Sequence, residues 1–68
     1  MKLKELLKVM AAAQEVTIIS YEREDEEYKA YIAHSGKSED CPFKYIERRV
    51  IYFSAREDVV KIFIKARG

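Results

Sequence analysis

The chain has 68 residues, which is the length of one small domain, and a hydrophobic content of 49% with two glycines and one proline predicts folding rather than disorder. A formal net charge of +1 gives no overall reason to expect binding to nucleic acid or to an anionic membrane. A single cysteine, Cys41, excludes an internal disulfide, and the sequence has neither an apolar run of membrane-spanning length nor a signal-peptide pattern, so we expect a cytoplasmic protein.

The first predicted element is a helix over residues 2–13. Leu3, Leu6, Leu7 and Met10 have the spacing that forms one apolar stripe on a helix, and the three alanines that follow favour helix. A helix lying on a membrane surface is the alternative interpretation, but the stripe is short and lacks aromatic residues. We therefore expect the stripe to cover one face of a sheet.

A first β-hairpin is predicted next. Apolar and polar residues alternate over 15–22 and again over 28–34, which is typical of strands. The acidic turn between them, residues 23–27, contains no glycine or asparagine, so we expect an open loop of several residues instead of a tight turn.

Residues 35–38 are predicted to be a loop, and residues 41–47 a short helical turn that connects the two hairpins. Asp40 or Ser38 is the candidate N-cap, and proline is accepted in a first turn. Phe43 and Ile46 have the spacing to dock on one side of the turn.

A second hairpin is predicted from strands 50–55 and 59–64, with a loop over 55–58. Both strands are rich in β-branched and aromatic residues. The register that best separates charged from aliphatic side chains sets Ile51 opposite Ile62 and Phe53 opposite Val60, and a slip of one residue would mix the two faces.

These elements predict one α+β domain over residues 1–68, with an N-terminal helix packed on a four-stranded, mainly antiparallel sheet of two β-hairpins that a short helical turn joins. The predicted core consists of the aliphatic and aromatic positions that face the helix: Leu3, Leu6, Leu7, Met10, Val16, Ile18, Ile32, Ile51, Phe53, Val60, Ile62 and Ile64.

Charge is unevenly distributed along the chain. Residues 15–43 contain eight acidic and three basic side chains, whereas residues 44–68 contain seven basic and three acidic ones. Hairpins of opposite sign that lie together or face water would explain this. The alternative is a head-to-tail association of subunits, which salt would weaken.

Three short patterns give the chain a family resemblance: the opening Lys-Leu-Lys-Glu-Leu-Leu, a proline before a short docking turn, and closing strands with Val-Ile-x-Phe and Val-Val-x-Ile. In these patterns and in the order of its elements it resembles small uncharacterised proteins encoded by phages and prophages of Gram-positive bacteria. The resemblance implies an accessory protein of a mobile element and carries over no functional residues.

Residues able to support chemistry are few. His34 and Cys41 are the only candidates for a base and a nucleophile, and they lie on a strand end and in a loop. His34, Glu39, Asp40 and Cys41 are suitable metal ligands, but they lack the paired spacing of a zinc site. No glycine-rich phosphate loop is present. We predict a non-catalytic protein without metal or cofactor.

The sheet face opposite the helix is the candidate partner surface, because one helix cannot cover both faces. Its predicted residues are Ile19, Tyr21, Lys29, Tyr31, Tyr52, Val59, Lys61 and Phe63. We expect a homodimer, with a host or phage protein as a further partner. In one alternative, the sheet coils, the short turn with Phe43 and Ile46 folds over this face, and the tyrosines are ordinary half-exposed strand residues. In the other, the tyrosines and lysines weakly bind single-stranded nucleic acid.

Overall fold

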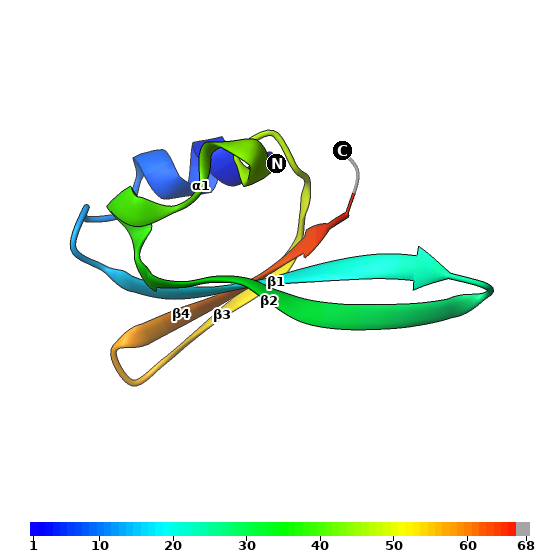
Figure 1. The fold of residues 1–68 in the computed structure, drawn as a ribbon. Helices are drawn as coiled ribbons and strands as arrows, with labels where there is room; N and C mark the ends of the chain where they lie inside the picture. The colour runs from blue at the N-terminus through cyan, green and yellow to red at the C-terminus, as the bar shows by residue number, and fades with distance from the viewer. Residues whose placement is uncertain (67–68) are drawn as a thin grey trace.

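The structure, a computed structural model, describes residues 1–66 apart from the side chain of Glu24. One helix and two 3-10 turns form a layer on one face of a four-stranded sheet (Figure 1). In chain order the elements are α1 (Leu3–Lys8), β1 (Glu15–Glu24), β2 (Glu27–Lys37), η1 (Ser38–Asp40), η2 (Phe43–Tyr45), β3 (Val50–Arg56) and β4 (Val59–Lys65). The predicted small α+β domain is therefore confirmed.

The sheet has the strand order β2-β1-β4-β3. The two hairpins are antiparallel, as predicted, but β1 and β4 pair in parallel at the centre of the sheet. The connection through η1 and η2 crosses the sheet on the side of α1, from one edge strand to the other (Figure 1). The sheet is thus mixed, and the two apolar inner strands are covered by the helical layer.

Helix α1 is shorter than predicted, because it ends at Lys8 and the three alanines lie outside it. Backbone groups of this segment bind the start of η1 instead of continuing the helix. The Ser38 hydroxyl donates to the carbonyl oxygens of Ala11 and Ala12 at 2.7 and 3.1 Å, and the Ser38 amide donates to Gln14 at 2.8 Å. The buried Ser38 therefore fixes the turn that leads into β1.

The predicted open loop of the first hairpin is wrong. Glu24 pairs with Glu27, so the loop is only Asp25 and Glu26, with φ angles of 45° and 70°. Two central residues with positive φ are the pattern of a type I′ turn, whose twist matches that of the flanking strands. Strand β2 also continues to Lys37 through the predicted loop 35–38, with Gly36 at a φ of 149°.

Both hairpins contain a register shift that the sequence did not reveal. In the first, Ile18 pairs with His34 but Ile19 pairs with Ile32. In the second, Val50 pairs with Ile64 but Tyr52 pairs with Phe63. Each shift is a β-bulge, which adds one residue to one strand and resets the alternation of side chains beyond it.

Three of the predicted core positions are wrong, two of them because of the bulges. Ile32 is 64% exposed and Ile51 is 52% exposed, since each now faces away from the helical layer. Phe53 pairs with Ile62 and not with Val60 as predicted, and it is 48% exposed on an edge strand.

The observed core lies between α1 and the two inner strands. Its buried apolar residues are Leu3, Leu6, Val16, Ile18, Tyr45, Ile62 and Ile64, with Leu7, Met10 and Val60 packed around them. Tyr45 of η2 was not predicted, whereas Phe43, expected to dock, is 83% exposed. At roughly 2 kcal/mol for each large buried side chain, so few residues give a small hydrophobic contribution.

The first residues of the chain are joined to the segment that precedes β3. Leu3 and Lys4 donate their amides to the carbonyls of Arg48 and Ile46, both at 2.8 Å. Glu47 forms ion pairs with Lys2 and Lys4 at 3.0 and 2.7 Å. These contacts hold α1 in place over the sheet.

Candidate partner interface

The sheet face opposite α1, which we call the back face, has a row of three aromatic rings. Tyr52, Phe63 and Tyr21 come from β3, β4 and β1, and the ring centroids of each neighbouring pair are 5.7 Å apart. Such cross-strand aromatic pairs stabilise a sheet. Because they lie on three adjacent strands, they form a continuous apolar strip without cover from α1 (Figure 1).

A shallow hollow extends this strip. The residues that line it define the apolar groove: Tyr21, Tyr28, Ile51, Tyr52 and Phe63. The groove has a volume of about 590 Å³. Tyr28 is 70% exposed, and the bulge in β3 turns Ile51 to the same side as Tyr52. The apolar groove is thus an exposed, mainly apolar hollow on the back face.

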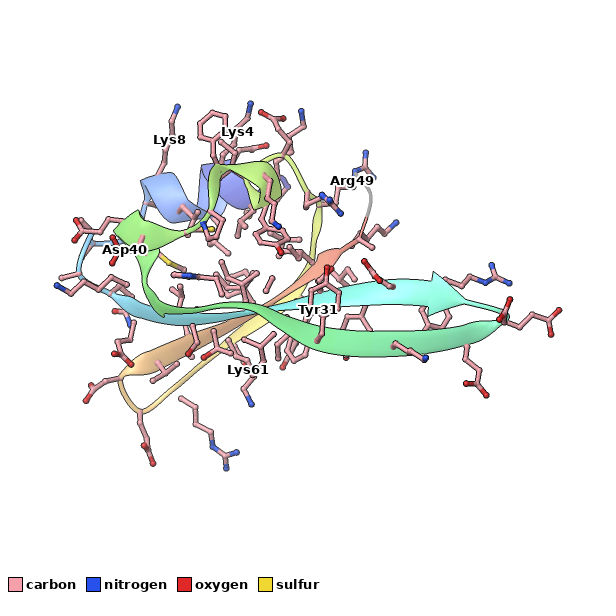
Figure 2. The ribbon with its side chains drawn as sticks, in the orientation of Figure 1. Lys4, Lys8, Tyr31, Asp40, Arg49 and Lys61 are labelled. Atoms are coloured by element: carbon pink, nitrogen blue, oxygen red, sulfur yellow. The ribbon has the colours of Figure 1, made fainter. Side chains whose placement is uncertain are left out.

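Most of the predicted partner residues lie on this face. Tyr21, Tyr52 and Phe63 line the apolar groove, and Ile19 pairs with Phe63. Lys61 points away from the helical layer (Figure 2). Val59, paired with Arg56 and Glu15 near the β3–β4 turn, alternates onto the same face.

Tyr31 and Lys29 lie on the other face of the sheet. Tyr31 pairs with the buried Ser20, and Figure 2 shows its side chain on the side of α1. Its hydroxyl donates to Glu22 Oε1 at 3.2 Å. Lys29 pairs with Glu22, which alternates with Ser20 onto that face. The bulge in β2 explains both placements. It puts Ile32 on the back face, and Tyr31 and Lys29, which precede Ile32 and alternate with it, therefore lie on the opposite face.

The arm is the part of the β1–β2 hairpin beyond the Tyr21–Lys65 pair, residues 22–29. Strand β1 pairs with β4 only as far as Tyr21, so the arm has no strand beside it on that edge. Figure 1 shows it projecting from the rest of the sheet. Its tip, Asp25, Glu26 and Glu27, is exposed and acidic.

A second groove lies at the base of the arm and has a different character. Its lining includes three cations from separate segments, Arg23, Arg48 and Lys65, and we call it the cationic groove. It shares Tyr21, Tyr28 and Ile51 with the apolar groove, and it has a volume of about 970 Å³.

Sequence reasoning did not find the cationic groove. The excess of basic residues after position 44 was the available signal. That signal could not place Arg23 and Lys65 in one groove, because this placement depends on the parallel pairing of β1 with β4. Among the described side chains, the ion pairs are those of Lys2 and Lys4 with Glu47. The three cations of the groove take part in neither of these ion pairs.

The two reactive side chains are each engaged separately. His34 Nε2 donates to the carbonyl of Lys37 at 2.9 Å, and the Cys41 thiol lies 3.7 Å from the carbonyl oxygen of Pro42. Burial raises the pKa of the Cys41 thiol, which disfavours its reactive thiolate form. Within residues 1–66, no hydrogen bond joins His34 to Cys41, so the arrangement provides no activated nucleophile.

Residues 1–66 contain no group of three His, Cys, Asp or Glu side chains placed to hold a metal ion. No helix among them has the length and apolar character needed to cross a membrane.

No protein-family model matches the chain, and comparisons with curated proteins and with solved structures also find no match. The resemblance to phage and prophage proteins, and the host or phage partner expected from it, stay predictions.

Proposed function

We propose that the chain is a non-catalytic protein-binding module that associates with itself through the back face of its sheet. The observation that supports this most directly is the apolar groove, where Tyr28, Ile51 and Tyr52 are all more exposed than buried. Contiguous exposed apolar surface of this kind is typical of protein interfaces. Tyrosine suits such a surface, because it combines a large apolar area with a polar hydroxyl.

The size of the face agrees with what a stable dimer needs. The two longer dimensions of the molecule are 37 and 23 Å. A face of those dimensions can supply the roughly 800 Å² per partner that a standard interface buries. The small core gives a second reason, because apolar burial between copies would add to the stability of a short chain.

Sedimentation equilibrium of the chain and of two exposed-residue variants tests the proposal. We expect a dimer at concentrations of about 100 µM, and we expect Ile51→Ser and Tyr52→Ser each to raise the dissociation constant at least about tenfold, since each removes apolar contact worth about 1–2 kcal/mol. Tyr31→Ser is the matched control, because Tyr31 is exposed on the other face.

Circular dichroism should show the same strand content in all of these variants. A wild-type chain that stays monomeric up to millimolar concentration would contradict self-association. Equal weakening by Tyr31→Ser would place the interface elsewhere.

Binding of single-stranded nucleic acid is the second candidate function, and the cationic groove is the observation that favours it. Three cations beside Tyr21 and Tyr28 combine charge for a phosphate backbone with rings on which bases stack. Fluorescence polarisation of labelled single strands should then show binding that weakens steeply as salt rises. A flat trace at low salt would remove this candidate.

A further inference from the structure

We propose that two copies of the chain pair through their arms about a two-fold axis, so that the acidic tip of each arm enters the cationic groove of the other copy. This inference rests on the proposed self-association and specifies its geometry. It assigns the acidic tip and the cationic groove as the two halves of one charged contact, made twice in the dimer.

The arm requires support that its own copy does not provide. Beyond Tyr21 it is a ribbon of two strands, and such ribbons are marginally stable in water. Its turn also holds Asp25 and Glu26 at positive φ, a conformation that aspartate tolerates but glutamate rarely adopts. Glu26 in this conformation costs stability locally, and a contact that uses its charge would offset this cost.

The charges on the two elements are complementary. The tip carries Asp25, Glu26 and Glu27, and the groove is lined by the three cations Arg23, Arg48 and Lys65 together with the carboxylate of Glu22. Opposite charges that meet across an interface fix the orientation of the partners and increase the rate of encounter.

The spacing along β1 also fits a two-fold axis. Arg23 pairs with Tyr28, and it lies two residues from Asp25 in one direction and two residues from Tyr21, the partner of Lys65, in the other. Each interval is about 7 Å of strand. An axis at the level of Arg23 and Tyr28 therefore brings the tip of one copy to the level of Lys65 in the other.

The same axis brings the exposed Tyr28 of each copy close to its counterpart beside the apolar groove, and it also brings the two Arg23 residues, the partners of Tyr28, near each other, so Lys65 and Arg48 are the cations that meet the acidic tip. The apolar contact between the Tyr28 side chains and the charged contacts between tips and grooves are thus related by the same two-fold axis. A back-to-back arrangement in which the arms point the same way would instead set the two acidic tips against each other, and like charges in an interface are unfavourable.

The acidic tip also argues against nucleic acid as the occupant of the cationic groove. It belongs to the same hairpin as Arg23, and its three carboxylates repel phosphates that approach the groove. Glu22 is among the residues that line the groove. A partner segment with a few carboxylates on a protein backbone fits this surface better than a continuous phosphate backbone.

Charge reversal at one residue of each half tests the pairing. We expect Glu26→Lys and Lys65→Glu each to raise the dissociation constant of the dimer at least about tenfold, because each sets like charges against each other at two symmetric contacts. An equimolar mixture of the two variants should associate nearly as tightly as the wild type, since only in the mixed dimer do both contacts join opposite charges.

Lys8→Glu is the matched control, because Lys8 lies on the helical layer and points away from the sheet (Figure 2). It changes the net charge as much as Lys65→Glu does and should leave the dissociation constant unchanged. Raising the salt from about 50 to about 500 mM should weaken the wild-type dimer and the mixed dimer alike.

The outcomes separate this inference from the proposed function. If Ile51→Ser dissociates the dimer while neither charge reversal nor mixing has an effect, self-association through the back face stands and the arm contact is overturned. If the wild type is a monomer, both are overturned. If a labelled single strand binds the wild type and Lys65→Glu abolishes that binding without affecting the dimer, the groove serves nucleic acid and the arm contact is again overturned.

Discussion

Among individual residues, Ser20 is a polar side chain in an apolar place. It is fully buried on β1, between Ile64 on β4 and Tyr31 on β2, and its hydroxyl has no hydrogen-bond partner among the described residues. A buried polar group without a partner costs about 1–3 kcal/mol. The alternation of β1 predicts the burial of this position, but it does not predict the loss of hydrogen bonding.

Ser20→Ala should therefore raise the free energy of unfolding by about 1 kcal/mol, because it removes the unsatisfied hydroxyl and leaves little empty space. Urea unfolding followed by circular dichroism measures this. Ser54→Ala, at a half-buried position of β3, should change stability by less than about 0.5 kcal/mol. A loss of stability on Ser20→Ala would show that the hydroxyl has a partner.

Cys41 gives a prediction about pH. Burial disfavours its thiolate, so the pKa of the thiol in the folded chain lies above the ordinary value of 9.0. Because the folded pKa is raised, this thiol stabilises the fold below pH 9.0, and that stabilisation is lost as the pH rises through the folded pKa. The rate of alkylation by iodoacetamide should accordingly have its midpoint above pH 9.0 in the folded chain.

The control for this measurement is the same chain in urea, where the midpoint should return close to 9.0. A folded chain that reacts with a midpoint below that value would mean that a positive charge, and not burial, dominates the surroundings of the thiol.

Among the elements, hydrophobic periodicity predicts which segments are strands better than where each side chain points. The alternation of β1 correctly placed Val16 and Ile18 in the core. Ile32 and Ile51 belong to the same alternating pattern, but each lies on a strand in which a bulge changes the face that the side chains occupy. Neither bulge has a glycine at the shift, so a sequence-based argument has no local signal for it.

The turn of the arm has a backbone conformation that its amino-acid composition does not indicate. Two acidic residues adopt positive φ there because the two-residue connection and the twist of the strands require it. The left-handed conformation costs about 1 kcal/mol or more for a residue such as Glu26, whereas aspartate adopts it more readily. Local preferences favoured a longer loop, and the pairing of β1 with β2 overrides them.

Glu26→Gly should raise the free energy of unfolding by about 1 kcal/mol, because glycine adopts this conformation without the steric cost. Thermal unfolding in a Tyr52→Ser background, which we expect to be monomeric, isolates the effect of the turn from association. Glu39→Gly, in the exposed turn η1, is the comparison at a position outside the positive-φ region and should not stabilise the chain. Equal stabilisation by both would assign the effect to lost charge.

At the scale of the whole molecule, the strand order is what the sequence could not supply. Two hairpins with the same residues can lie side by side in several orders, and the observed one depends on the parallel pairing of the two most apolar strands. That Tyr21, Tyr52 and Phe63 share one face was predictable from strand alternation, whereas their continuity as a strip depends on this strand order. The cationic groove was not predictable, because its cations come from three segments that this strand order brings together.

Self-association couples the stability of the whole molecule to its concentration. If two folded copies bind each other and unfolded chains do not, mass action makes the dimer more resistant to unfolding as the chain becomes more concentrated. For a domain of this size, the Tm should rise by about 3 to 5 °C for each tenfold increase in concentration above the dissociation constant. Scanning calorimetry measures this, and in the Tyr52→Ser variant the rise in Tm should begin only at concentrations at least about tenfold higher. A constant Tm for the wild type would mean that the back face contributes nothing to stability through a second copy, however apolar it is.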